Sequence, residues 1–204
     1  LTFSEFSNSN TNTDNLISKF MRTFTFSKPD KSDNIIYSET VEDVRYNLGQ
    51  ELYLNMKNNN KHLIEMLKMK NAIVCGVPHS GIAYGEGFAK LSEFEYKQII
   101  KKNISANFGE RTFILENQNK RESASMEKYK YDYTAEDISR PLIVIDDSIV
   151  RGTTARKLIN DLKTIGFKIY FLSGSPPVCN ECNYGVNMGS RDNLLINNKS
   201  TQAN

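Results

Sequence analysis

Residues 141–154, PLIVIDDSIVRGTT, constrain the fold of this chain more than any other stretch. Residues 142–145 form a short apolar run, β-branched apart from Leu142, with the length of a buried parallel strand. Asp146 and Asp147 follow at the point where such a strand ends. Residues 148–154 then form a loop with one glycine, and a helical pattern begins after them. This order of strand, loop and helix predicts an anion site, because free backbone N–H groups and the helix dipole point at one place.

The two carboxylates allow two functional interpretations, metal ligands or acceptors for the hydroxyls of a vicinal diol, beside the simpler one of a polar turn. Adjacent residues of an extended chain point to opposite faces, so Asp146 and Asp147 would rarely bind one ion directly. Two neighbouring sugar hydroxyls with Mg²⁺ nearby suit this geometry better. Neither a Walker A loop nor a complete GxGxxG fingerprint occurs. The stretch therefore predicts a phosphate and a polyhydroxyl group held side by side at the end of a strand.

A second strand, loop and helix precede the first. Residues 72–77 (AIVCGV) predict a buried strand, residues 78–81 (PHSG) a tight loop, and residues 82–91 a helix rich in small side chains. Two such loops in one sheet could hold the two ends of a multiply phosphorylated ligand. A plain strand-to-helix turn is the alternative interpretation.

The rest of the chain alternates predicted helices and strands. Helices are predicted over residues 41–56, 62–69 and 155–164, strands over residues 94–100 and 168–172, and a short helix over residues 190–195 with Ser190 as its cap, while weaker strand signals lie at residues 20–26 and 184–186. In the first helix the apolar side chains at helical spacing are Val41, Val44, Leu48, Leu52 and Met56. The alternation favours an α/β fold with a doubly wound, mostly parallel sheet and flanking helices.

Composition suggests where the folded domain begins and ends. Residues 1–19 are polar and low in complexity, which is typical of a flexible linker or arm. Residues 20–196 are predicted to form one domain, followed by a polar tail over residues 197–204. Residues 101–133 are basic and rich in asparagine, and favour either a solvated loop or a flexible lid that closes over an anionic ligand.

Charge and cysteine content restrict the class of protein. A net charge of +2 gives no argument for a nucleic-acid or membrane surface, so neither partner is expected, and no apolar run has the roughly 20 residues of a membrane span. Three cysteines and no visible signal peptide suit a reducing compartment, so the predicted location is the cytoplasm. Cys179 and Cys182 form a lone CxxC pair, which is weak evidence for zinc. The chain starts at Leu1 rather than Met, which predicts that it is part of a longer polypeptide.

The motif VIDDSIVRGTT resembles the phosphoribosyl-pyrophosphate (PRPP) binding motif of type I phosphoribosyltransferases. Its unbroken form, DDSIVRGTT, is similar to the amidophosphoribosyltransferase family, whose phosphoribosyltransferase domain is C-terminal. Further stretches fall in the order of that family, and together they cover residues 20–196. These stretches are FSKPD at 26–30, VRYNLGQEL at 44–52, GVPHSG at 76–81, KN followed by RTFI at 102–114, the segment 118–121, and SPP…C.YGV.M at 175–188.

The resemblance implies a role for each candidate residue. Asp146 and Asp147 would bind the ribose hydroxyls and, with Ser80, hold Mg²⁺. Lys102 and Arg111 would be catalytic cations of a loop that closes over the substrate. The residues expected to bind PRPP are Asp146, Asp147, Ser148, Val150, Arg151, Gly152, Thr153 and Thr154 around the ribose 5-phosphate, with Pro78, His79, Ser80 and Gly81 around the pyrophosphate.

The implied reaction is the first step of de novo purine synthesis, in which ammonia attacks C1 of PRPP and pyrophosphate leaves. The family takes the ammonia from glutamine by means of a glutaminase half, and this chain lacks that half, so the expected partner is a glutaminase domain upstream or in trans. A homo-oligomer is also expected. Cys182 matches a cysteine that binds an iron–sulfur cluster in some members, but Lys19 stands at the position of another ligand, so no cluster is predicted.

Two departures from the family pattern keep other functions open. His79 stands where the pyrophosphate loop often has aspartate, and Ser125 and Met126 stand where paired arginines are usual. Both changes would weaken the hold on phosphate or metal. The alternatives are a non-catalytic PRPP-binding regulatory domain and a transferase that acts on a nucleobase.

Overall fold

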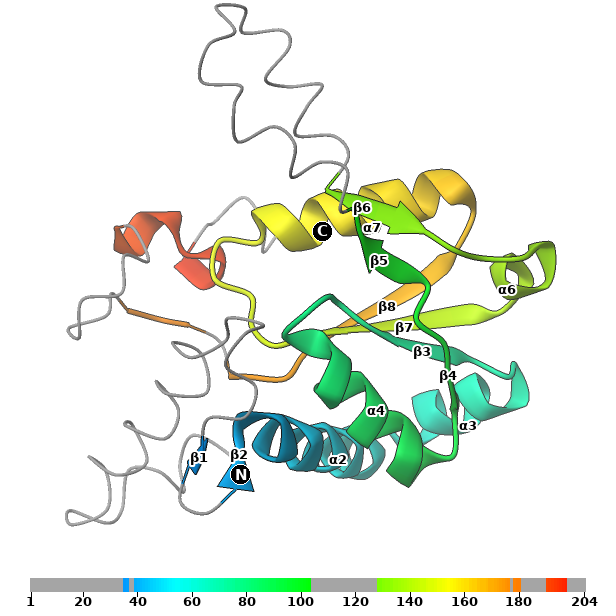
Figure 1. Cartoon of the computed structure of the whole chain (residues 1–204), viewed down its shortest axis with the longest axis horizontal. Helices are drawn as coiled ribbons and strands as arrows, with labels where there is room; N and C mark the ends of the chain where they lie inside the picture. Colours follow the sequence, from blue (N-terminus) through cyan, green and yellow to red (C-terminus); the bar gives the residue numbers. More distant parts are fainter. Residues whose placement is uncertain (1–34, 37–38, 104–127, 177, 181–189, 198–204) are drawn as a thin grey trace, which may run out of the picture.

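Four strands form a parallel sheet in the order β4-β3-β7-β8 (Figure 1). The computed structural model describes residues 35–36, 39–103, 128–176, 178–180 and 190–197. The strands of the sheet are β3 (Ile73–Gly76), β4 (Glu95–Tyr96), β7 (Pro141–Asp146) and β8 (Lys168–Ser173). The prediction of an α/β fold built on a parallel sheet is confirmed.

The two central strands are the two apolar runs that flank the predicted loops. Every residue of β3 and β7 is buried, because helices cover both faces of the sheet. β3 pairs with β7 from Ile73 opposite Leu142 to Gly76 opposite Ile145. The predicted strand over residues 94–100 is wrong in part, since only β4 joins the sheet. The Gln98 side chain explains the early end, because its amide donates to the carbonyls of Gly76 and Ile100 and turns the chain away.

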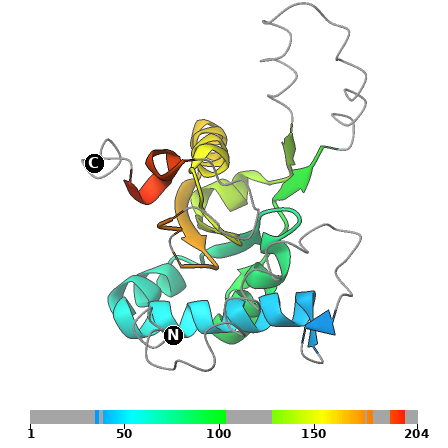
Figure 2. The same cartoon turned by 90° about the vertical axis from the view of Figure 1, so that its left-hand side faces the viewer.

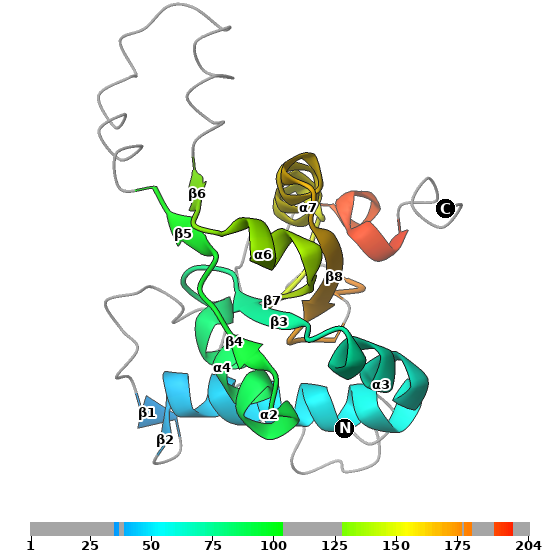
Figure 3. The same cartoon turned by 90° about the vertical axis from the view of Figure 1, so that its right-hand side faces the viewer.

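Helices lie on both faces of the sheet (Figures 1 and 3). One face packs against α2 (Val41–Asn59), α3 (Lys61–Met69) and α4 (Gly81–Ser92), and the other against α6 (Ala135–Ser139) and α7 (Thr153–Ile165). All but α6 were predicted. The five residues of α6 are too few to show helical periodicity, although Thr134 caps this helix through Asp137. Gly166 ends α7 in the left-handed conformation, with a φ of 116°, as its position predicts.

The buried side of α2 is turned somewhat from the predicted apolar stripe, since Val41 and Met56 are buried as predicted and Val44 and Leu52 are half-buried. Thr40 caps it, and the Thr40 hydroxyl oxygen accepts a hydrogen bond of 3.0 Å from the Asp43 backbone N–H. Leu48, part of the predicted apolar stripe, is 36% exposed. The buried side of the helix consists of Val41, Arg45, Gly49, Tyr53 and Met56.

A two-stranded antiparallel ribbon stands on the α7 side of the sheet (Figures 2 and 3). Its strands are β5 (Ile100–Lys102) and β6 (Tyr129–Tyr131), and its inner side chains pack on the core beneath α7. The ribbon connects to both ends of the segment 104–127, which contains most of the predicted lid and lies outside the described residues. The sequence did not indicate a ribbon there, because a two-stranded pair this short has no clear alternating pattern.

The remaining elements are short. β1 (Ile35–Ile36) and β2 (Glu39–Thr40) pair with each other in antiparallel fashion. The predicted helix over residues 190–195 is wrong, since the chain forms two 3₁₀ turns, η3 (Arg191–Asn193) and η4 (Leu195–Asn197). Buried Leu194 between them explains the break, because it must turn into the core. The predicted strands over residues 20–26 and 184–186 lie outside the described residues. None of the described helices has the length and apolar character needed to cross a membrane.

Acid is expected to destabilise the fold through Asp137, whose side chain is 4% exposed. Burial favours its neutral form, but hydrogen bonds from Lys97 and from the Thr134 backbone and hydroxyl hold the pKa of Asp137 below its usual value. The stabilisation is therefore complete above about pH 4, and it is lost as the pH falls through the folded pKa. Urea unfolding between pH 7 and pH 2 should show a loss of about 1–3 kcal/mol from this group, the scale of hydrogen bonds to a charge. In Asp137→Asn this part of the acid dependence should vanish; an identical acid profile in the variant would contradict the assignment.

Candidate functional site

The site lies where the order of the strands reverses. The chain runs from β3 through α4 outward to β4, and then returns to the other side of β3 to form β7 and β8. The loops after β3 and β7 therefore start side by side and leave toward opposite faces of the sheet (Figure 1). Ligands of open α/β sheets bind at such a crevice, outside the carboxyl ends of the strands. The structure thus brings together the two loops that the sequence singled out.

The loop 78–81 is held directly against the end of β7. The Val77 backbone N–H donates a hydrogen bond of 2.8 Å to the Ile145 carbonyl, which extends the pairing of the strands by one residue. A Cβ atom on Gly81 would lie 2.3 Å from the same carbonyl, so only glycine permits this approach. The peptide bond between Pro78 and His79 is cis. The His79 side chain is exposed and that of Ser80 is half-buried, so both can contact a ligand above the sheet.

The two carboxylates differ in their surroundings. Asp146 ends β7 and is buried, and its Oδ1 accepts a hydrogen bond of 3.0 Å from the Asp147 backbone N–H. Burial and then the neighbouring charge of Asp147 raise the pKa of Asp146 to about 7, against a smaller opposite effect of Lys128. Asp147 is half-buried, and its Oδ1 lies 3.5 Å from the Ser148 hydroxyl. Asp147 therefore faces the crevice more openly, while Asp146 lies behind it.

The loop 148–152 ends on the open N-terminus of α7. Gly152 occupies the cap position with a φ of 75°, a conformation that favours glycine, and no side chain of the described residues caps the helix. The backbone N–H groups of the first turn lack intrahelical acceptors, and the side chains of Thr153 and Thr154 are exposed beside them. Leu195 supports the loop, since its N–H donates to the Val150 carbonyl at 2.9 Å. This arrangement fits the predicted phosphate cradle.

The ribbon carries the described cations that are candidates for the site. Lys102 ends β5 and is exposed, and Asn103 after it donates its backbone N–H to the Lys128 carbonyl, which closes the base of the ribbon. The charge of Lys128 slightly lowers the pKa of Asp146, which makes this lysine a further candidate for the site although the sequence did not single it out. Its only signal was membership of a basic stretch. Arg111, the other predicted catalytic cation, lies outside the described residues.

Two buried polar residues behind the carboxylates were also missed. Tyr84 belongs to the first turn of α4, and Arg45 belongs to the buried side of α2. Burial and then the charge of Asp147 raise the pKa of the Tyr84 hydroxyl, and Arg45 acts in the opposite direction. In sequence, Tyr84 reads as a core residue and Arg45 as a solvated helix position, so no pattern connects either with the loops.

A hollow of about 800 Å³ lies at the opposite edge of the sheet, around the amino ends of the strands. Arg140 spans it, with an ion pair of 2.7 Å to Glu95 and a hydrogen bond of 2.6 Å to the Asn71 carbonyl. None of the loops with free backbone N–H groups or paired carboxylates faces this hollow. The crevice at the carboxyl ends is therefore the better candidate site.

Comparison with known proteins agrees with this geometry. The amidophosphoribosyltransferase of Synechocystis sp. is 33% identical over 173 residues, which cover 83% of this chain and 31% of that protein. The enzyme of the same name from Methanocaldococcus jannaschii is 32% identical over 155 residues, 76% of this chain and 32% of that protein. This chain is a relative of the amidophosphoribosyltransferases. No protein family model matches it.

A solved amidophosphoribosyltransferase has the same fold. The glutamine PRPP amidotransferase from Bacillus subtilis, in a complex with ADP and GMP, superposes with a TM-score of 0.64 at 27% identity, over 90% of this chain and 36% of that one. The expected resemblance and the phosphoribosyltransferase fold are thus confirmed. The chain spans about a third of the length of the amidophosphoribosyltransferases that it matches.

Proposed function

We propose that this domain binds PRPP with Mg²⁺ and transfers an amino group from ammonia to C1 of the ribose, as the names of its relatives suggest. The observation that carries the proposal is the pair Asp146 and Asp147 beside the open N-terminus of α7, across the crevice from the loop 78–81. The pair offers acceptors for a diol, and a place for phosphate lies on each side of it. PRPP has the matching groups in that order: the 5-phosphate, the ribose diol and the pyrophosphate.

The geometry supports a role for each part. The half-buried Asp147 carboxylate can accept hydrogen bonds from ribose hydroxyls, while buried Asp146 holds the Asp147 backbone N–H. The first-turn N–H groups of α7 and the exposed hydroxyls of Thr153 and Thr154 can donate to the 5-phosphate. Ser80 and the loop around it would then hold the pyrophosphate, with Lys102 and Arg111 as the expected cations of the lid.

The carboxylate pair fits a divalent cation. Two adjacent carboxylates, one of them buried with a pKa raised to about 7, repel each other, and a cation would relieve that repulsion. The described residues contain no group of three or more His, Cys, Asp or Glu side chains able to hold a metal. The carboxylate pair itself is the support for Mg²⁺, which proteins often bind through one or two carboxylates together with the phosphates of the substrate. When bound, Mg²⁺ would neutralise charge on the pyrophosphate as it leaves.

The reaction requires stabilisation of a departing anion. The nitrogen lone pair of ammonia forms the bond to C1, the bond from C1 to the pyrophosphate oxygen breaks, and its electron pair leaves with pyrophosphate. The nitrogen then loses a proton, which gives 5-phosphoribosylamine. Positive charge develops on the sugar and negative charge on the leaving group, so cations such as Lys102 and donors around Ser80 would contribute most of the catalysis. Exclusion of water would prevent hydrolysis of PRPP.

Pyrophosphate release tests the proposal. The protein is incubated with PRPP and Mg²⁺, with and without ammonium, and pyrophosphate is measured. Release that depends on ammonium is expected. PRPP binding without such release would support the regulatory alternative. The exposed His79 favours that alternative, because histidine lacks the negative charge that aspartate would place beside the metal. Release only with a purine base would support the nucleobase alternative.

The relatives also suggest partners for the whole protein. We propose that a glutaminase domain, upstream or in trans, supplies the ammonia, that the protein forms a homo-oligomer, and that it works in the cytoplasm. The proposed glutaminase is tested by giving the longest form of the protein that can be expressed glutamine in place of ammonium. Release of pyrophosphate is then measured.

A further inference from the structure

Tyr84 combines complete burial with a hydroxyl that has no hydrogen-bond partner among the described residues. Its side chain is 0% exposed. A buried hydroxyl without a partner costs free energy, and phenylalanine would fill the same space without that cost. Packing alone therefore explains the aromatic ring and leaves the hydroxyl unexplained.

The ring of Tyr84 is held in one place by its neighbours. A Cβ atom on Gly174 would lie 2.5 Å from two carbons of the ring, so the ring rests directly on the backbone that follows β8. The Gly174 N–H donates a hydrogen bond of 2.7 Å to the Asp146 carbonyl, which ties this backbone to the end of β7. On its other side, the Tyr84 carbonyl meets α2 at Gly49, where a Cβ atom would lie 2.1 Å away.

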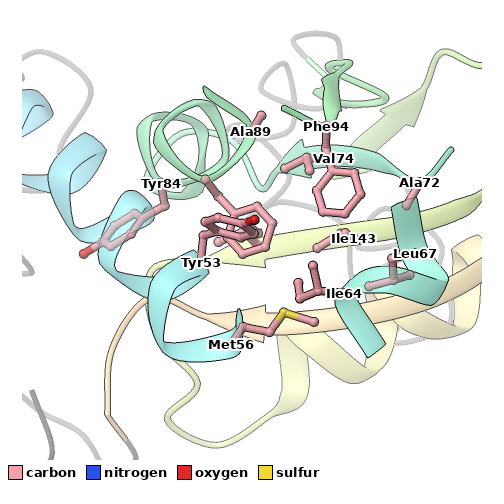
Figure 4. Close-up of a cluster of buried hydrophobic side chains, with 12 residues drawn as sticks. Tyr53, Met56, Ile64, Leu67, Ala72, Val74, Tyr84, Ala89, Phe94 and Ile143 are labelled. Atoms are coloured by element: carbon pink, nitrogen blue, oxygen red, sulfur yellow. The ribbon is translucent and has the colours of Figure 1, made fainter. Parts of the chain in front are cut away.

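The hydroxyl points toward the candidate site. Figure 4 shows the Tyr84 ring extending away from the other labelled core side chains, with its oxygen in the direction of the carboxyl ends of the strands. Besides burial, the charges of Asp147 and Asp146 raise the pKa of this hydroxyl and the charge of Arg45 lowers it, which agrees with this direction. Since the ring packs on the backbone that is tied to the Asp146 carbonyl and the side chain is fully buried, the hydroxyl approaches the end of β7 from inside the protein.

We propose that Tyr84 is a positioning residue of this site, whose buried hydroxyl donates a hydrogen bond to the carboxylate pair when a ribose diol binds and so fixes the orientation of Asp147. Tyrosine can donate this hydrogen bond and phenylalanine cannot. A carboxylate is the acceptor that gains most from it in a buried place. The inference rests on the proposed function, since it assumes that the diol binds at Asp147.

The variant Tyr84→Phe tests the proposal, because it removes the hydroxyl and keeps the ring. Affinity is measured by calorimetry for two probes with Mg²⁺ present: PRPP, and ribose 5-phosphate, which has the diol and the 5-phosphate without pyrophosphate. Loss of a hydrogen bond to a charged group should weaken both about tenfold. The melting temperature without ligand should stay the same or rise, because an unpartnered buried hydroxyl has been removed. Tyr53→Phe is the control, since it removes a hydroxyl from the same core cluster, on α2.

The outcomes separate this inference from the proposed function. Reduced affinity in Tyr84→Phe with an unchanged or higher melting temperature, and no such loss in Tyr53→Phe, would support the positioning role. Unchanged affinity in Tyr84→Phe would overturn it while leaving the proposed function intact. If the unsubstituted protein binds ribose 5-phosphate and not PRPP, the proposed function fails and ribose 5-phosphate still decides the role of Tyr84. Binding of neither probe would overturn both.

Discussion

Asp147→Asn is expected to weaken PRPP binding by about 1–3 kcal/mol, roughly fivefold to more than a hundredfold in the dissociation constant. An amide keeps the shape of the side chain, but it replaces one acceptor oxygen by a donor and removes the charge that hydrogen bonds from a diol strengthen. Asp147 is the half-buried member of the pair and faces the crevice, so its substitution should alter binding more than folding. Calorimetric titration with PRPP and Mg²⁺ measures the effect.

Asp161→Asn is the matched control for this variant. Asp161 lies on α7 and accepts a hydrogen bond of 2.9 Å from the Tyr131 hydroxyl, away from the crevice. The same chemical change there should leave PRPP affinity as it is. Equal affinity in Asp147→Asn and the unsubstituted protein would refute the role of Asp147 as the diol acceptor.

The sequence predicted those parts of the site that consist of consecutive residues. The stretch 141–154 contains a strand, two carboxylates, a loop and a helix start in order, and the stretch 72–91 repeats the order of strand, loop and helix. Parallel strands place their carboxyl ends at one edge, so two such stretches indicate a common crevice once they are adjacent. Their adjacency came from the structure, through the pairing of β3 with β7 and the approach of Gly81 to the Ile145 carbonyl.

The missed parts of the site depend on contacts between distant segments. Tyr84 packs on Gly174, whose backbone is tied to the Asp146 carbonyl, because α4 folds back onto the sheet. The charge of Lys128, from the ribbon, bears on the pKa of Asp146. Neither residue stands in a motif, and each has an ordinary explanation when read locally. Residues that only the tertiary fold brings together form no motif with a fixed sequence spacing, so the sequence does not reveal them.

The helix α2 shows the same limit in the core. Hydrophobic spacing predicted an apolar stripe that includes Leu48, whereas the buried side includes Arg45 and Gly49. The reason is close contact with α4. Glycines let the two helix backbones touch, so the contact face has small residues where an ordinary interface would have large apolar ones. Counting apolar residues therefore predicted the helix and both ends of its buried side, Val41 and Met56, but missed Arg45 and Gly49 at the contact with α4.

Gly87→Ala is expected to destabilise the protein by about 3 kcal/mol, the scale of overpacking in a tight interior. A Cβ atom on Gly87 would lie 2.0 Å from the backbone carbonyl oxygen of Tyr46, which no rotation of a side chain can relieve. The helices α2 and α4 would have to move apart, and this would also displace Tyr84 from Gly174 and the carboxylates. Urea unfolding measures the free energy, and PRPP titration should show weaker binding as well.

The sign of this effect distinguishes packing from intrinsic preference. In a helix interior alanine is more favourable than glycine by about 1 kcal/mol, so helix propensity alone predicts that Gly87→Ala stabilises the protein. Lys90→Ala, on the exposed side of the same helix, removes no close contact and should be nearly neutral. A Gly87→Ala protein as stable as the original or more stable would show that the helices tolerate a wider separation. Destabilisation in Gly87→Ala and not in Lys90→Ala, together with weaker PRPP binding, would establish that the close crossing of α2 and α4 holds the site in place.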